Sequence, residues 1–119
     1  MATPWRLERR SGTSQELHDL DLDAGGEPDA AVSRLVRWNQ VTDASLVVGS
    51  AQPPASIDPA GLEAAGLRSA RRRSGGGAVL LLPGAQVWVD VFLPSDDELW
   101  CDDVDRSAWW LGAVWVDAL

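Results

Sequence analysis

The sequence predicts an α+β fold, a single small domain in which helices flank a mostly antiparallel sheet. The chain has 119 residues, which is enough for one domain and too few for two. Apolar residues make up 45% of the chain, as in ordinary globular proteins, so disorder is not expected. Helical and strand-like patterns follow one another in the order helix, strands, helix, hairpin, helix.

The N-terminal part is predicted to pass from a loose segment into a short helix. Residues 1–12 are polar and are expected to be loosely ordered, so the domain proper covers residues 13–119. Thr13 and Glu16 have the spacing of a capping box, which marks a helix start. One side of this helix carries leucines, namely Leu17, Leu20 and Leu22. Residues 23–30 contain glycine, proline and aspartate, which indicates a surface loop.

Two strands and a second helix are predicted next. Residues 31–38 alternate in part, and residues 45–50 are a clearer strand because β-branched residues lead up to a glycine. The helix after them has Asp58 as its N-cap and Pro59 as its first residue. Gly66 is predicted to end it.

A hairpin is predicted between residues 78 and 93. Residues 78–82 are apolar on both faces, as expected of an inner strand. Pro83 and Gly84 then turn the chain. Residues 86–93 alternate as a strand does, so the two segments are predicted to pair antiparallel.

The last predicted element is a helix with one apolar stripe. Asp102 or Asp103 can cap its start. The stripe has helical spacing and consists of Val104, Ala108, Leu111, Trp115 and Ala118. The chain has seven tryptophans, and we expect these large side chains to fill the core.

Composition and charge argue against several classes of protein. A net charge of −8 argues against nucleic acid as a partner, because phosphates are repelled. The single cysteine, Cys101, excludes an internal disulfide and any multi-cysteine metal cluster, and no metal site is expected. No run approaches the ~20 apolar residues of a spanning helix, and the N-terminus lacks the apolar core of a signal peptide. We therefore expect a cytoplasmic protein with no membrane partner.

The strongest functional signal is the run of three arginines, a serine and three glycines at residues 71–77. Glycine lets other groups approach the main chain, and consecutive N–H groups can form a nest for an anion, with arginine forks beside it. The competing interpretation is a flexible approach to the hairpin with solvated arginines. The run is neither a Walker A loop nor a dinucleotide fingerprint, because no Gly-Lys-Ser/Thr follows and a strand stands where a helix is required.

The segment Arg71–Val79 resembles the RRxSGGGAV signature of lipoate–protein ligases, in the biotin/lipoate ligase superfamily. Residues 45–52 resemble the strand and turn that precede the ligand site in that family, with Gln52 at its glutamine. Residues 87–94 and 99–112 resemble an actinobacterial-type branch. The resemblance runs from about residue 11 to the end of the chain and is most specific at the glycines.

The resemblance implies a partial, class II synthetase-like catalytic domain. It implies that ATP, with Mg²⁺, activates lipoate to lipoyl-AMP, and that the acyl group passes to a lysine of a lipoyl carrier domain, in a 2-oxoacid dehydrogenase or the glycine cleavage H protein. It also implies which residues bind lipoyl-adenylate: Arg72, Ser74, Gly75, Gly76, Gly77, Ala78, Val79 and Gln52.

This sequence departs from the family pattern at important places. The His-Asp pair and the asparagine that follow the signature are absent, and Pro53 replaces an asparagine after Gln52. The chain has no lysine, although the family's catalytic lysine lies in a second half of the domain. The resemblance therefore implies the N-terminal half of such a domain, which is either a fragment or truncated reading frame or a chain that needs a separately encoded second half. We expect exposed apolar surface and no ligation by this polypeptide alone. The catalytic residue stays unassigned.

Several alternatives stay open. The chain could be a non-catalytic partner or relic that binds lipoyl compounds, an octanoyltransferase of the same superfamily, or an unrelated anion-binding module. Lipoate, octanoate and biotin are not distinguished by the sequence. His18 is interpreted as an exposed surface histidine. Cys101 is a poor nucleophile because Asp102 and Asp103 oppose thiolate formation.

Overall fold

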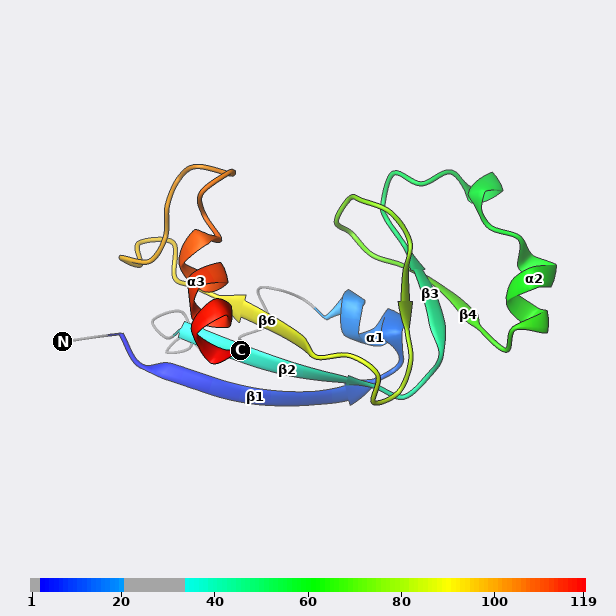
Figure 1. The fold of residues 1–119 in the computed structure, drawn as a ribbon, viewed down its shortest axis with the longest axis horizontal. Coiled ribbons are helices and arrows are strands. Elements are labelled where there is room, and N and C mark those ends of the chain that lie inside the picture. The colour runs from blue at the N-terminus through cyan, green and yellow to red at the C-terminus, as the bar shows by residue number, and fades with distance from the viewer. Residues whose placement is uncertain (1–2, 21–33) are drawn as a thin grey trace.

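The computed structural model describes residues 3–20 and 34–119, and the predicted loop at 23–30 and Leu22 lie outside them. The α+β class is confirmed (Figure 1). The elements are, in order, β1 (Trp5–Gly12), α1 (Ser14–Asp19), β2 (Arg34–Val41), β3 (Ser45–Val48), the 3-10 turn η2 (Pro54–Ser56), α2 (Pro59–Ala64), β4 (Arg68–Arg71), β5 (Val79–Leu81), β6 (Trp88–Phe92) and α3 (Trp109–Ala118).

The first sheet has the strand order β1-β2-β6. β1 pairs parallel with β2 along its whole length, from Trp5 opposite Arg34 to Gly12 opposite Val41. The expectation that residues 1–12 are loose is therefore wrong for residues 5–12. Polar side chains do not prevent a strand here, because Glu8 lies within 3.3 Å of both Arg6 and Arg37 and so pairs charges along and across the strands.

The second sheet has the order β4-β3-β5, and all three of its strands lie between β2 and β6 in the sequence. β3 pairs parallel with β4 and antiparallel with β5. Both sheets are therefore mixed, with one parallel and one antiparallel pairing each, where the sequence predicted mostly antiparallel pairing. β4 was not predicted, because the arginine-rich segment 68–71 has no apolar alternation.

The predicted hairpin does not form, although its turn does. Gly84 has a φ of 73°, and Ala85 N donates to Leu82 O at 3.1 Å, as a tight turn requires. Leu82 N then donates to the side-chain Oε1 of Gln86 instead of to a returning strand. β5 pairs with β3, and β6 crosses to the other sheet to pair with β2. β5 is accordingly an edge strand, and not the inner strand that its apolar sequence suggested.

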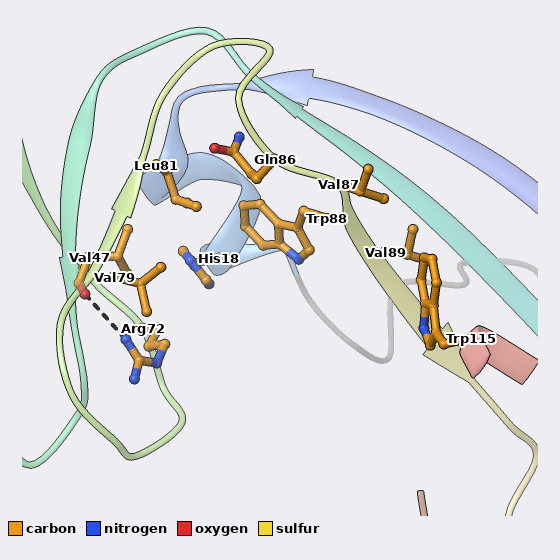
Figure 2. Close-up of a pocket in the computed structure, with 10 residues that line it drawn as sticks. All are labelled: His18, Val47, Arg72, Val79, Leu81, Gln86, Val87, Trp88, Val89 and Trp115. Atoms are coloured by element: carbon orange, nitrogen blue, oxygen red, sulfur yellow. Dashed lines mark hydrogen bonds between the residues drawn. The ribbon is translucent and has the colours of Figure 1, made fainter. Parts of the chain in front are cut away.

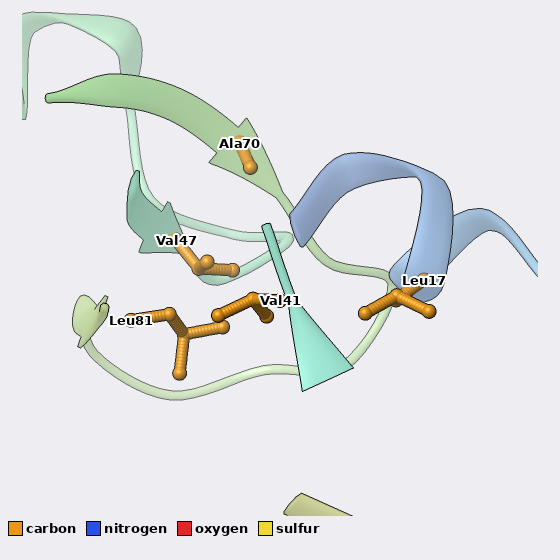
Figure 3. Close-up of a cluster of buried hydrophobic side chains, with 5 residues drawn as sticks. All are labelled: Leu17, Val41, Val47, Ala70 and Leu81. Atoms are coloured by element: carbon orange, nitrogen blue, oxygen red, sulfur yellow. The ribbon is translucent and has the colours of Figure 1, made fainter. Parts of the chain in front are cut away.

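A small core lies where the two sheets meet α1 (Figure 3). It consists of Leu17, Val41, Val47, Ala70 and Leu81, with Leu20 and Trp88 packed against it. The capping box at Thr13 and Glu16 forms as predicted and starts α1. The side chain of Gln15 exchanges two hydrogen bonds with the backbone of Arg71, so α1 is tied to β4 as well as to the first sheet.

The tryptophans do not fill this core. Five of the seven are exposed, namely Trp5, Trp38, Trp100, Trp109 and Trp115. α3 has no buried residue and contacts the first sheet through Trp110, whose ring centroid lies 6.3 Å from that of Trp5. The helix starts at Trp109, later than predicted, because Asp103 caps a separate turn by accepting from Asp105 N.

α2 follows the sequence prediction more closely. Pro59 is its first residue, and Asp58 occupies the N-cap position without a side-chain capping bond. Gly66 has a φ of 69° just after the helix, which suits a C-terminal stop.

The segment between β6 and α3 is held by a buried ion pair. Arg34 donates from Nε to Asp97 Oδ2 at 2.8 Å and from Nη2 to Asp97 Oδ1 at 2.9 Å. The Arg34 guanidinium holds the pKa of Asp97 below its ordinary value of 3.8, which burial alone would raise. This contact joins the start of β2 to the chain that leads into α3.

Candidate functional site

Residues 72–78 form a loop between β4 and β5, called the glycine loop below, and the side chain of Arg72 bonds to its carbonyl groups. Arg72 Nη2 donates to the carbonyl oxygens of Gly75 and Gly77, both at 2.7 Å. Its Nη1 donates to Val47 O on β3 at 3.2 Å. Gly76 has a φ of 96°, a conformation that favours glycine. The loop is therefore fixed to the neighbouring strand, and the flexible alternative does not describe it.

A second turn, directly after β3, packs against this loop. Gly49 N donates to the side chain of Gln52 at 2.8 Å, and Arg71 Nη1 donates to Gly49 O and Gln52 O at 2.9 Å each. A Cβ on Gly49 would collide with the carbonyl oxygen of Gly76. The two turns can only be this close because residue 49 is a glycine.

In this loop carbonyl groups have hydrogen-bond partners, and the amide groups of the glycines have none in the described part of the chain. The carbonyls of Ser74, Gly75 and Gly77 accept hydrogen bonds from Ser50 N and from Arg72. The N–H groups of residues 75–77 donate to no acceptor among the residues that the structure describes, and all three glycines are exposed. Amide groups of this kind present partial positive charge to solvent and suit an anion.

A pocket of about 520 Å³ adjoins the loop and lies between the two sheets (Figure 2). Its walls come from α1, β3, β5, the start of β6 and α3, and are mostly apolar. They consist of His18, Val47, Arg72, Val79, Leu81, Gln86, Val87, Trp88, Val89 and Trp115. Val79 and Leu81 point into the pocket from β5 because alternate residues of a strand share a face.

One wall of the pocket is formed by His18 packed against Trp88, with tilted rings whose centroids lie 4.4 Å apart. Trp88 Nε1 donates to Asp90 Oδ1 at 3.2 Å, and Asn39 Nδ2 donates to Asp90 Oδ2 at 2.8 Å, so the indole is held in place from β2. Burial and then the charge of Arg72 lower the pKa of His18 below 6.5, against Asp90 and Asp19, which raise it. The imidazole is thus favoured in its neutral form.

The residues that the resemblance implies fall into three groups. Arg72 and Val79 line the pocket. Ser74, Gly75, Gly76, Gly77 and Ala78 form the exposed loop beside it. Gln52 is not a lining residue, and its side chain instead closes the turn after β3. The structure therefore brings the loop and the pocket together through Arg72.

Sequence reasoning missed His18, Trp88 and Trp115 as pocket residues. The prediction that His18 is an exposed surface residue is wrong, since it is half-buried against Trp88. Cys101 is exposed and is not among the lining residues. Among residues 3–20 and 34–119, no group of three His, Cys, Asp or Glu side chains could hold a metal ion. Nor does any helix in those ranges have the length and apolar character to cross a membrane.

Comparisons with known proteins place the fold. No protein-family model and no curated protein matches this chain. Two solved structures of protein Ta0514, a putative lipoate protein ligase from T. acidophilum, are similar to it at 22% and 23% identity, with TM-scores of 0.50 and 0.51. The second of these contains bound lipoic acid. Each match covers 71% of this chain and 35% of the solved one, so the chain spans about a third of their length. What the chain shares with them is the fold of that part.

Proposed function

We propose that this chain is a lipoate-binding part of a lipoate–protein ligase-like enzyme. The pocket would hold the dithiolane ring and hydrocarbon chain of lipoate, and the glycine loop would hold the phosphate of lipoyl-AMP. We further propose that the acyl group is transferred to a lysine of a lipoyl carrier domain. The proposed location is the cytoplasm.

The observation that carries the proposal is the placement of an apolar pocket beside a loop whose amides have no acceptor among the described residues. Arg72 belongs to both, since it lines the pocket and bonds the carbonyls of Gly75 and Gly77. Lipoate has an apolar chain ending in a carboxylate, and its adenylate adds a phosphate at that end. A ligand of this shape would bury its chain among Val79, Leu81 and Trp88 and leave its charged end at the loop. One of the similar solved structures contains bound lipoic acid, which supports lipoate as the ligand.

In the proposed reaction the lipoate carboxylate attacks the α-phosphorus of ATP, and pyrophosphate leaves. Amides of residues 75–77 would stabilise charge on the α-phosphate without reorganisation. The amine of the carrier lysine then attacks the acyl carbon, and AMP leaves. Mg²⁺ would enter with ATP as part of the nucleotide substrate, and we assign no residue to it.

This chain has no lysine, so no ammonium group of its own can meet the α-phosphate. Losing one such electrostatic contact slows a reaction roughly 10²–10³-fold. We therefore propose that residues 1–119 by themselves bind lipoate and do not activate it, and that the missing group comes from outside these residues. Pyrophosphate release from ATP and lipoate by the purified chain should stay at background, and robust release would contradict this part of the proposal.

Lipoate binding can be tested with two neighbouring substitutions on β5. Val79 and Leu80 are almost equally exposed, at 48% and 50%, but only Val79 lines the pocket. Val79→Asp should weaken lipoate binding at least about tenfold, because it places a carboxylate beside an apolar, anionic ligand. Leu80→Asp adds the same charge outside the pocket and should leave the affinity within about twofold.

Isothermal titration of lipoate into the wild-type chain and both variants measures these affinities. Equal affinities of Val79→Asp and Leu80→Asp would place lipoate elsewhere. Absence of binding to the wild-type chain would remove the proposal.

A further inference from the structure

The three consecutive arginines have different partners. Arg71 donates from Nη1 to the carbonyls of the turn after β3, at Gly49 and Gln52. Arg72 donates to three carbonyls, on β3 and in the loop. Arg73 is exposed and makes no hydrogen bond or ion pair with the residues that the structure describes. Two of the three guanidinium groups are therefore engaged with the protein's own backbone.

The engagement of Arg72 determines which way the loop peptides face. One guanidinium, using both Nη atoms, spans the carbonyls of Val47, Gly75 and Gly77. In a trans peptide the N–H points opposite to the C=O, so the N–H groups of Gly76 and Ala78 point away from Arg72 when the carbonyls of Gly75 and Gly77 turn toward it. The packing of Gly49 against the Gly76 carbonyl is an independent constraint in the same direction.

We propose that Arg72 is a positioning residue, which holds the amides of the glycine loop outward, and that the side-chain contact with a bound phosphate group is made by Arg73. This rests on the proposed function in so far as that function places a phosphate at the loop. It reverses the assignment by resemblance, in which Arg72 faces the adenylate. The reason is geometric, since the two Nη atoms of Arg72 already have carbonyl partners at 2.7–3.2 Å.

Two charge-conserving variants separate positioning from charge. Arg72→Lys keeps the positive charge but replaces the planar fork by a compact ammonium that cannot span the three carbonyls. Arg73→Lys keeps a charge that is sufficient for contact with a phosphate. In the ligand-free chain, the ¹H–¹⁵N nuclear Overhauser values of Gly75, Gly76 and Gly77 should fall toward flexible-chain values in Arg72→Lys. They should be unchanged in Arg73→Lys, with the amides of Leu17 and Val41 reporting that the core is intact in both.

Titration with inorganic phosphate, followed by the amide shifts of residues 75–77, tests the anion contact. Arg73→Gln should weaken phosphate binding about tenfold, since a charge-assisted hydrogen bond is lost. Arg73→Lys should stay within about threefold of the wild type. Because Arg73 is exposed and unpaired within the described residues, the Arg73 variants remain informative even if Arg72→Lys fails to fold.

Each outcome decides a part of the inference. An ordered loop in Arg72→Lys would remove the positioning role. A phosphate affinity that is unaffected by Arg73→Gln, or no phosphate-dependent shift in the wild-type amides, would remove the contact by Arg73. Lipoate binding is read separately from the Trp88 indole signal. If the proposed function is wrong, lipoate will not shift the Trp88 indole signal. The results for Arg72 and Arg73 do not depend on that signal.

Discussion

Gly49 shows how a single missing Cβ shapes the site. A methyl group at this position would collide with the Gly76 carbonyl and force apart the two turns that Arg71 and Arg72 bind. Gly49→Ala should therefore destabilise the chain by about 1–3 kcal/mol, the usual range for an overpacked site. Gly75→Ala is the matched control, because a Cβ there meets nothing within 4 Å. Urea unfolding of both variants measures the difference, and equal stabilities would show that the turns do not pack as described.

His18 predicts how stability depends on pH. Its pKa in the folded state is lowered from 6.5, chiefly by burial and then by Arg72, so protonation favours the unfolded chain. The stabilising effect of the neutral form is complete above pH 6.5 and is lost as the pH falls below 6.5 toward the folded-state pKa. The free energy of unfolding should thus decrease between about pH 7.5 and about pH 5.5.

The control is His18→Gln, which cannot titrate. His18 is the single histidine of the chain, so the variant should have a flat profile across this range. Urea unfolding at a series of pH values measures both proteins, and a wild-type profile that is flat too would argue that His18 is solvated.

At this scale the glycine loop could be predicted from sequence and the aromatic wall could not. Three consecutive glycines at residues 75–77 indicate an exposed backbone by composition alone. His18 stands in a helix of six residues, too short for a periodic pattern to assign its faces, and its partner Trp88 is 70 positions away. The bonds from Arg72 to backbone carbonyls could not be predicted either, because every residue has a carbonyl and the residue type does not show which one accepts.

Among the elements, local signals were reliable and pairings were not. The capping box, the strand that starts at Ser45 and the helix that starts at Pro59 were predicted because a few neighbouring residues determine each of them. The hairpin of residues 78–93 failed although its turn is correct, because strand pairing is decided by the free edges of β2 and β3. β1 was missed because its residues are mostly charged, and part of that charge is paired by a distant strand, through Arg37.

The ion pair of Arg34 with Asp97 is the element-scale contact most open to test. Asp97→Asn should lower the Tm by several degrees, because a buried guanidinium loses the carboxylate that bonds two of its nitrogens. Glu98→Gln changes a neighbour whose side chain is 78% exposed and should have little effect. Differential scanning calorimetry compares the two. A similar Tm for both variants would show that Arg34 is compensated by water.

For the molecule as a whole, the expectation of exposed apolar surface is confirmed. The described residues extend 55 Å along the longest axis and 29 Å along the others, and α3 at one end buries none of its side chains. Val104, Val116 and Leu119 are 95%, 77% and 99% exposed. Of the predicted helical stripe only Leu111, Trp115 and Ala118 lie in α3, since Val104 and Ala108 precede the helix. The described residues do not provide the packed face that its spacing predicted.

In the sequence, all strands of the second sheet lie between the second and third strands of the first sheet, and this order affects folding on the ribosome. β3, β4 and β5 all precede β6, so the second sheet can close while the third strand of the first sheet is still being synthesised. Until residue 92 emerges, β2 keeps an open edge that can recruit the wrong strand. The growing chain therefore completes the glycine loop early, and the pocket wall that β6 and α3 contribute late.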